Sequence, residues 1–539
     1  MKKILLTFAA LSLFSLPFAQ DFGHGDGDFG GGDFFGGFDD AASSVTISGE
    51  VGASARAWLG TEARQSERNT RKGYTRDTRG YDKFHDLSRS ETEGSVHADI
   101  GLDYAGESTD AMIRIKLDSS TIKDFPEDVI DEAAVSGNFR GGQILLKAGK
   151  FKEVWGKGDK IHVLDNFNAN DYTDFIFPDY IDRRIGEVML KATANLSWDY
   201  NLKLEGILTP MMTADRFASS GMLVPYRQRK LEDTVRKILK ARADSDSDIV
   251  QAVMSLSDFS IDGLYEDNIR SLKYGQAGAR LTGTLGGFDL GASYYYGHYK
   301  QPSANLERTI RYNYFKSAAE SGLPGMDDAA KNALQDALPS LSYDQLQVFG
   351  LEAAFVLWKL NTRWEAAYNL TEDTAGDNPW IKNNSVSWVA GFDIDLPLHN
   401  LNLNVQETGS VILNGRKIKD MSRGIRVGGA TIPWSAIGAN HDVDYNSDGK
   451  YTRNKLIVLL SDKWLNERLT TEIQGIYGFE CGEFMVAPKI EYDISEGLTL
   501  TGRAVYLYSN NENGEFYNFT RESVHHDKAF AEFGVRYQF

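Results

Sequence analysis

Residues 529–539 read AFAEFGVRYQF and carry the pattern that decides the fold. Every second side chain from Ala529 to Phe539 is apolar or aromatic, and only Phe530 breaks the alternation with residues such as Arg536. Because successive side chains of a β-strand point to opposite faces, the stretch predicts a strand with one apolar face and one polar face. Aromatic residues at the end of such a strand are typical of the boundary between a membrane and water.

The same two-residue period returns along the whole chain after residue 44. The runs amount to about eighteen strands, within a range of roughly sixteen to eighteen. They lie at residues 45–59, 96–104, 111–117, 133–139, 144–148, 188–198, 202–208, 275–285, 288–296, 351–357, 362–370, 386–396, 401–405, 456–460, 469–479, 486–494, 498–508 and 529–539. The run at 456–460 is less regular than the others.

The connections between these strands alternate between long and short, with one exception at residues 480–483. The short ones are rich in the Gly, Asn and Asp that tight hairpins require. Short turns on one rim and long loops on the other are typical of bacterial outer-membrane barrels, whose short turns face the periplasm. We therefore predict an all-β fold, a transmembrane antiparallel β-barrel of about 16–18 strands. Its long extracellular loops are expected to be partly helical, at 227–256 and 329–338.

Three segments follow one another along the chain. Residues 1–19 combine a charged start, an apolar run and a small residue at the end, which predicts a secretory signal peptide. Residues 20–44 are rich in Gly, Asp and Phe and are expected to form a flexible leader. Residues 45–539 contain all the predicted strands and form the barrel domain.

Composition narrows the classes of partner. The single cysteine, Cys481, excludes a disulfide within the chain. No stretch beyond the signal peptide approaches ~18 consecutive apolar residues, so we expect no membrane-spanning helix. The net charge of −18 argues against nucleic acid as a partner. Lipid of the bacterial outer membrane is therefore the expected surroundings of the strands.

The polar face of the predicted strands contains charges of both signs. An apolar packing of this face would leave every one of these charges without water, so the pattern predicts a water-filled lumen. The charged residues predicted to face inward are Glu50, Arg56, Asp99, Arg114, Lys116, Lys147, Lys191, Lys203, Glu205, Arg280, Asp289, Arg363, Glu365, Asp393, Glu472, Lys489, Glu491, Arg503, Glu532 and Arg536.

The third long connection, residues 149–187, contains Trp155-Gly156…Asp165 and the phrase Asn168…Asp171. With these motifs, the strand pattern and the terminal Phe539, the chain resembles the general-porin class of outer-membrane barrels. It resembles the export barrels that include the alginate exporter more loosely. In porins the third loop folds into the lumen and narrows it, with acidic loop residues facing basic residues of the wall.

The resemblance implies a constriction built from two sets of residues. The acidic set in the loop is Asp159, Asp165, Asp171 and Asp174, and the basic set on the wall is Arg56, Arg114, Lys116 and Lys147. The alternative is a loop that caps the mouth of the barrel from outside. Because the long loops are acidic while the inward charges are nearly balanced, we expect a weak preference for cations.

A second loop resembles the first half of a calcium-binding loop. Asp444, Asn446 and Asp448 place oxygen ligands at alternate positions, and Gly449 follows them. Lys455 stands where a full site has a bidentate Glu, which excludes a complete EF-hand. We expect a weak Ca²⁺ site here and no other cofactor; the alternative is a polar turn.

These features predict an outer-membrane channel for the passive diffusion of small polar solutes. The alternatives are a transporter of hydrophobic or polymeric molecules, for which helical loops would form a vestibule, and a surface adhesin. We expect no enzymatic activity, because the scattered histidines form no recognisable catalytic pattern. Because porins are commonly trimers, the resemblance is compatible with a homotrimer, but the sequence leaves the oligomeric state open. The resemblance also implies that the barrel-assembly machinery recognises the C-terminal strand, which ends at Phe539.

Overall fold

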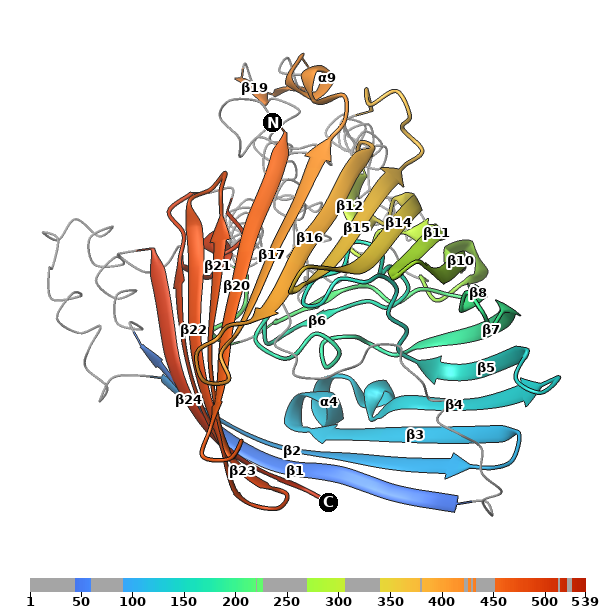
Figure 1. The fold of residues 1–539 in the computed structure, drawn as a ribbon. Coiled ribbons are helices and arrows are strands. Elements are labelled where there is room, and N and C mark those ends of the chain that lie inside the picture. Colours follow the sequence, from blue (N-terminus) through green and yellow to red (C-terminus); the bar gives the residue numbers. More distant parts are fainter. Residues whose placement is uncertain are drawn as a thin grey trace, which may run out of the picture.

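The structure is a computed structural model, shown in Figure 1. It describes residues 44–59, 91–219, 221–225, 269–305, 340–378, 381–420, 425–427, 430–432, 451–511, 514–520 and 526–539. The signal peptide and almost all of the leader lie outside these residues, as do the segments for which helices are predicted.

An 18-stranded antiparallel sheet forms the body of the molecule and confirms the predicted fold class. Its strands are β1 (Ser44–Leu59), β2 (Glu91–Ala105), β3 (Thr109–Asp118), β4 (Ile130–Phe139), β5 (Ile144–Phe151), β7 (Glu187–Ser197), β8 (Leu202–Thr209), β10 (Gln276–Leu285), β11 (Phe288–His298), β14 (Gln345–Leu357), β15 (Leu360–Leu370), β16 (Ser385–Asp395), β17 (Asn402–Ile412), β20 (Thr452–Trp464), β21 (Leu469–Gly478), β22 (Glu483–Ser495), β23 (Leu498–Tyr508) and β24 (Asp527–Gln538).

Smaller elements lie in the connections. They are the helices α4 (Ser119–Asp124), α9 (Gly415–Asp420) and α10 (Tyr517–Thr520), the 3-10 turns η2 (Pro126–Asp128) and η4 (Leu272–Tyr274), and the short pairs β6 (Asp171–Tyr172) with β9 (Arg216–Phe217), β12 (Ser303–Asn305) with β13 (Ser340–Ser342), and β18 (Ile425–Val427) with β19 (Ala430–Ile432). No helix of the described part is long and apolar enough to cross a membrane.

Each barrel strand pairs with the next one along the chain, and the last pairs with the first. The closing ladder between β24 and β1 runs from the Glu50–Gln538 pair to the Leu59–Ala529 pair. Eight hairpin turns lie on one rim, while the connections on the other rim are long except at residues 479–482. The sheet therefore has no free edge, which is the condition for a strand-based structure to span lipid.

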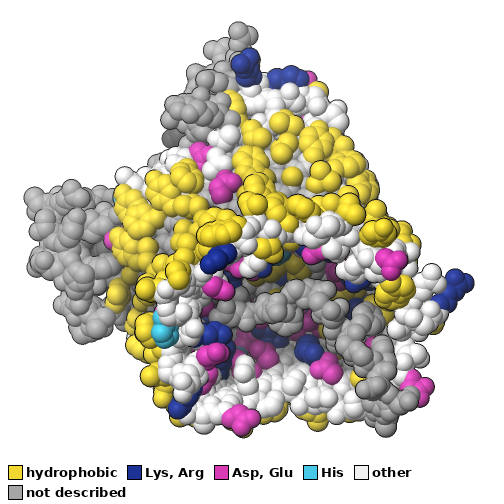
Figure 2. Space-filling model, in the orientation of Figure 1, with side chains coloured by type: hydrophobic (Ala, Val, Ile, Leu, Met, Phe, Trp, Pro, Cys, Tyr) yellow, Lys and Arg dark blue, Asp and Glu magenta, His cyan; other side chains and the backbone are white. Residues whose placement is uncertain are grey.

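The outer face of the barrel is apolar. Leu351, Phe533 and Val96 all face outward and expose 64%, 71% and 69% of their surfaces. Figure 2 shows hydrophobic side chains covering the upper outer surface, over the strands that Figure 1 labels β14 to β20. Such a surface is stable only in contact with lipid. The chain is thus a multi-pass β-barrel of the bacterial outer membrane.

The inner face is partly different from the prediction. Charged side chains face inward, but Ile457, Ile476 and Val505 also do, and all three are buried. The irregular run at 456–460 follows from this, because β20 is apolar on both faces here. Phe530 breaks the alternation of β24 for the same reason: it points inward and packs against Trp58. On the long-loop side the inner face of the barrel is therefore partly apolar and packed.

A lumen loop crossing the barrel

Residues 152–186, which we call the lumen loop, connect β5 to β7 through the inside of the barrel. The loop first reaches β15, six strands from β5 around the 18-stranded ring, and then passes β1 and β23 before it joins β7. Trp155, Phe167 and Phe175 are at most 1% exposed, because they pack against inward-facing wall residues and other loop residues. The loop is therefore a folded part of the interior.

One wall carboxylate holds residues 158–164 of the lumen loop. Glu365 of β15 is fully buried, and its Oε1 accepts hydrogen bonds from the Gly158 amide at 2.6 Å and from His162 Nδ1 at 2.9 Å. Its Oε2 accepts from the Val163 amide at 2.7 Å and the Leu164 amide at 3.3 Å. Four donors on one carboxylate fix both the position and the direction of this loop segment.

The loop comes this close to Glu365 because it has no side chain at Gly156. A Cβ at Gly156 would lie 2.1 Å from Glu365 Oε1, and the φ of this glycine is +114°. Other side chains have neither the space nor the backbone freedom for this position. Gln406 of β17 adds a further contact, because its Oε1 accepts from the Lys160 amide at 3.3 Å.

Two arginines of the wall hold residues 174–177 of the loop. Arg56 of β1 donates to both carboxylate oxygens of Asp174, at 2.5 and 2.9 Å, and to Glu532 of β24 at 2.5 Å. Arg503 of β23 donates to the carbonyl oxygen of Phe177 at 2.7 Å and also pairs with Glu532. The bidentate geometry of Arg56 makes this a strong anchor.

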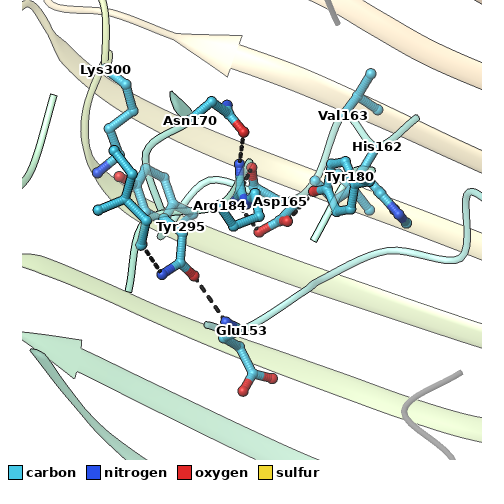
Figure 3. A network of polar contacts seen from close by, with 12 residues as sticks. Glu153, His162, Val163, Asp165, Asn170, Tyr180, Arg184, Tyr295 and Lys300 are labelled. Atoms are coloured by element: carbon cyan, nitrogen blue, oxygen red, sulfur yellow. Dashed lines mark hydrogen bonds and ion pairs between the residues drawn. The ribbon is translucent and has the colours of Figure 1, made fainter. Parts of the chain in front are cut away.

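Polar contacts within the loop join its segments to one another (Figure 3). Arg184 pairs with Asp165 at 2.7 Å, donates to Asn170 Oδ1 at 2.9 Å, and lies beside Tyr180, whose hydroxyl donates to Asp165. Asn168 ties the two ends of the loop together, since it accepts from the Glu153 amide and donates to the carbonyl oxygen of Ile185. These contacts make the loop a rigid unit.

Two ionisable groups, Glu153 of the loop and Lys300 beside it, have perturbed pKa values. Burial lowers the pKa of Lys300 to about 8, against the opposing effect of the Glu187 and Asp215 carboxylates. Burial also raises the pKa of Glu153, although the ammonium of Lys191 lies 2.6 Å away. Both groups are packed inside the barrel, where water stabilises charge poorly.

An apolar cluster fills the interior on the long-loop side. Inward-facing residues of β16 and β20 to β24 contact residues of the lumen loop, of 217–224 and of 516–519. The cluster includes Val389, Ile457, Ile476, Met485, Val505, Leu507, Phe175, Ile176, Phe177, Met222, Leu223, Phe516 and Phe519. The loop is thus fastened to the wall by apolar contacts as well as by the polar anchors.

A cavity of about 3160 Å³ occupies the interior on the hairpin side of the lumen loop. Its wall includes inward-facing residues of most strands, and the loop contributes residues 152–154, 156–160, 162 and 179–182 to its lining. Figure 2 shows the hollow, with basic and acidic side chains gathered inside it. The cavity is therefore charged and water-accessible, as expected for the path of a polar solute.

The structure places the residues of the predicted constriction at different points. Arg56 and Asp174 contact each other, as described above. Arg114, Lys116, Lys147 and Asp159 line the cavity, where Arg114 pairs with Asp103 at 2.8 Å and Asp159 accepts a hydrogen bond from Asn404.

The other two acidic residues have partners within the loop: Asp165 has Arg184, and Asp171 accepts from the Thr173 hydroxyl. Among the described residues no ion pair joins a loop aspartate to Arg114, Lys116 or Lys147. Their role in a constriction stays a prediction.

The predicted calcium ligands Asp444, Asn446 and Asp448 lie outside the described residues. Within the described part of the chain, no group of three or more His, Cys, Asp or Glu side chains is arranged to hold a metal ion.

Glu365 was not singled out by the sequence, where it is one of many inward charges. The signal that could have pointed to a close contact is the pair Gly156 and Gly158 in the segment WGKGDK. Paired glycines allow a chain to approach another group closely. The identity of that group depends on which strand lies opposite, and local sequence does not contain this information.

Comparison with solved structures gives distant likenesses. No protein-family model and no curated protein matches the sequence. Among solved structures, a BenF-like porin from Pseudomonas fluorescens is 10% identical, with a TM-score of 0.43 and with 92% of this chain and 98% of that chain covered. OccAB4 from Acinetobacter baumannii is 9% identical, with a TM-score of 0.41 and the same coverage. Wzi from Escherichia coli, a carbohydrate-binding barrel, is 9% identical, with a TM-score of 0.38 and with 90% and 83% covered.

Proposed function

We propose that this chain is an outer-membrane channel through which small polar solutes diffuse passively, and that the lumen loop narrows its bore. The observation that carries the proposal is the large cavity with charges of both signs beneath the loop. Hydrated solutes are accepted by such a lining, whereas an enzyme or an adhesin needs only the rim of a barrel. The proposal includes no catalytic activity.

The lumen loop is suited to set the size limit of the channel. It crosses the bore between Glu365 and Arg56 and is held there by both polar and apolar contacts. A loop fixed to the wall at two places does not move aside, so a solute that passes it meets a constant width. Passage of hydrophobic molecules is less well supported, because the apolar part of the inner wall is covered by packed side chains while the open cavity is charged.

Planar-bilayer recording of the purified protein tests this function. We expect discrete conducting steps from the wild type and larger steps after deletion of residues 155–179. The matched control deletes residues 312–336, a segment of equal length in another long connection, and should leave the conductance of the bore closer to wild type. Folding of each variant is checked by the shift in gel migration on heating.

Two results would count against the proposal. A protein that inserts as a folded barrel and never conducts is not a channel, and a role at the cell surface would then be favoured. Equal conductance of the wild type and the 155–179 deletion would show that the loop does not limit the bore.

A further inference from the structure

Two carboxylates of the lumen loop differ from the others. The remaining loop aspartates have close partners, as described above, but Asp179 and Asp182 make no hydrogen bond or ion pair through their carboxylates with any described residue. Both line the cavity. The Asp182 amide donates to the carbonyl oxygen of Asp179 at 3.1 Å, so one tight turn holds the two residues together. We call this pair the acidic edge.

The charges around the acidic edge come from several elements. Lys160 of the lumen loop and Lys489 of β22 act on Asp179 as cations, while Glu491 of β22 acts as an anion. Arg536 of β24 pairs with Glu491 at 3.4 Å. Asp182 is acted on by an anion, Asp99 of β2, and by a cation, Lys116 of β3. The cations near Asp179 are thus partly offset by other carboxylates, and the charge of the edge itself is not neutralised by a direct partner.

From this geometry we infer that the acidic edge determines the charge preference of the channel, and that Asp179 switches this preference between neutral and mildly acidic conditions. The inference rests on the proposed channel function. At neutral pH the edge presents free negative charge to the cavity and favours small cations over small anions. Protonation of Asp179 removes one of its two charges.

The environment of Asp179 places the pKa of its carboxyl group between neutral and mildly acidic pH. Burial raises the pKa of Asp179 to about 6; Lys489 and Lys160 act in the opposite direction, and Asp182 and Glu491 raise it further. With this pKa the carboxylate is more than about nine-tenths ionised at pH 7.5 and only about one-tenth ionised at pH 5.0. Since the charge is lost as the pH falls through about 6, the preference for cations should fall over the same range.

The test measures reversal potentials in a potassium chloride gradient, with the protein in a planar bilayer at pH 7.5 and pH 5.0. We expect the ratio of K⁺ to Cl⁻ permeability of the wild type to fall by up to about thirtyfold on acidification, because one unit charge about 4 Å from a passing ion in water favours K⁺ about fivefold and disfavours Cl⁻ about fivefold. Asp179→Asn should already show the low ratio at pH 7.5 and change little with pH. Asp182→Asn should lower the ratio at pH 7.5 but keep the pH dependence.

Asp199→Asn is the matched control, because Asp199 is an exposed residue of a hairpin turn and is not part of the cavity lining. Its ratio should equal that of the wild type at both pH values. A wild-type ratio that does not change with pH, or an equal change in Asp179→Asn, would overturn the inference while the channel function stands. Absence of any conductance would instead overturn the channel function, and the inference with it.

Discussion

Replacement of Glu365 by alanine should release residues 158–164 of the lumen loop from the wall. The substitution removes the acceptor of four donors and leaves the amides of Gly158, Val163 and Leu164 buried without it. Hydrogen bonds to a charged group contribute about 1.5–3 kcal/mol each, but they are not additive. Leaving a buried donor without its acceptor costs about 1–3 kcal/mol, so the loss of three amide contacts, taken as less than additive, should cost about 3–5 kcal/mol in total.

A loss of about 3–5 kcal/mol shifts the equilibrium between the docked and undocked loop by about two to three and a half orders of magnitude. We therefore expect larger or noisier conducting steps from Glu365→Ala than from the wild type. The barrel itself should still form, because the ladders from β14 to β16 are made by backbone groups. Single-channel recording measures the steps, and gel migration with and without heating reports the barrel.

Glu352→Ala is the matched control for this experiment. Glu352 lies directly opposite Glu365 on β14 and is also buried, but it pairs with Arg280 of the wall at 2.6 Å. Its loss should weaken the wall without freeing the loop. The reasoning is refuted if Glu365→Ala forms a barrel whose steps match those of the wild type, or if Glu352→Ala increases the steps to the same extent.

Three further predictions concern stability and metal binding. Arg56→Ala removes the cation that Asp174 and Glu532 share, although Glu532 keeps Arg503, and should cost about 1–3 kcal/mol of unfolding free energy in denaturant titration. Arg363→Ala, which removes a more exposed arginine from its pair with Asp393, should cost less, and equal losses would contradict this. Leu351→Arg puts a charge on the lipid face and should destabilise the barrel in vesicles by about 2–4 kcal/mol relative to Leu351→Ala, and an unchanged unfolding midpoint would argue against lipid contact at this position. From the sequence of residues 444–449 we expect heat of binding when the folded barrel is titrated with millimolar calcium, and less heat from Asp448→Asn; no heat from the wild type would remove the calcium site.

The wall of the barrel follows from local sequence to a large extent. Alternation fixes which side chains share a face, and the glycines, asparagines and aspartates of the turns fix where the strands reverse. All eighteen predicted runs fall on strands of the barrel, and even the irregular one at 456–460 lies within β20.

The filling of the barrel does not follow in the same way. Inward-facing Ile457 and Phe530 look like errors in the pattern until the lumen loop is placed against them. The partner of Gly158 is Glu365, 207 positions away along the chain, and only the closed sheet brings the two together. Contacts between a loop and a distant strand depend on tertiary geometry, which a two-residue period does not record.

Arg56 of the first barrel strand contacts Glu532 of the last one, 476 positions away along the chain. The same side chain also donates to Asp174 of the lumen loop. Native pairing at this seam has to wait until nearly the whole chain has been exported, which makes closure a late event of folding. The same arginine binds Asp174, so the lumen loop gains this anchor in its full form only when the seam has formed. Closure of the barrel and placement of the loop are thereby coupled, because a barrel without the native seam would lack one of the contacts that fix the loop across its interior.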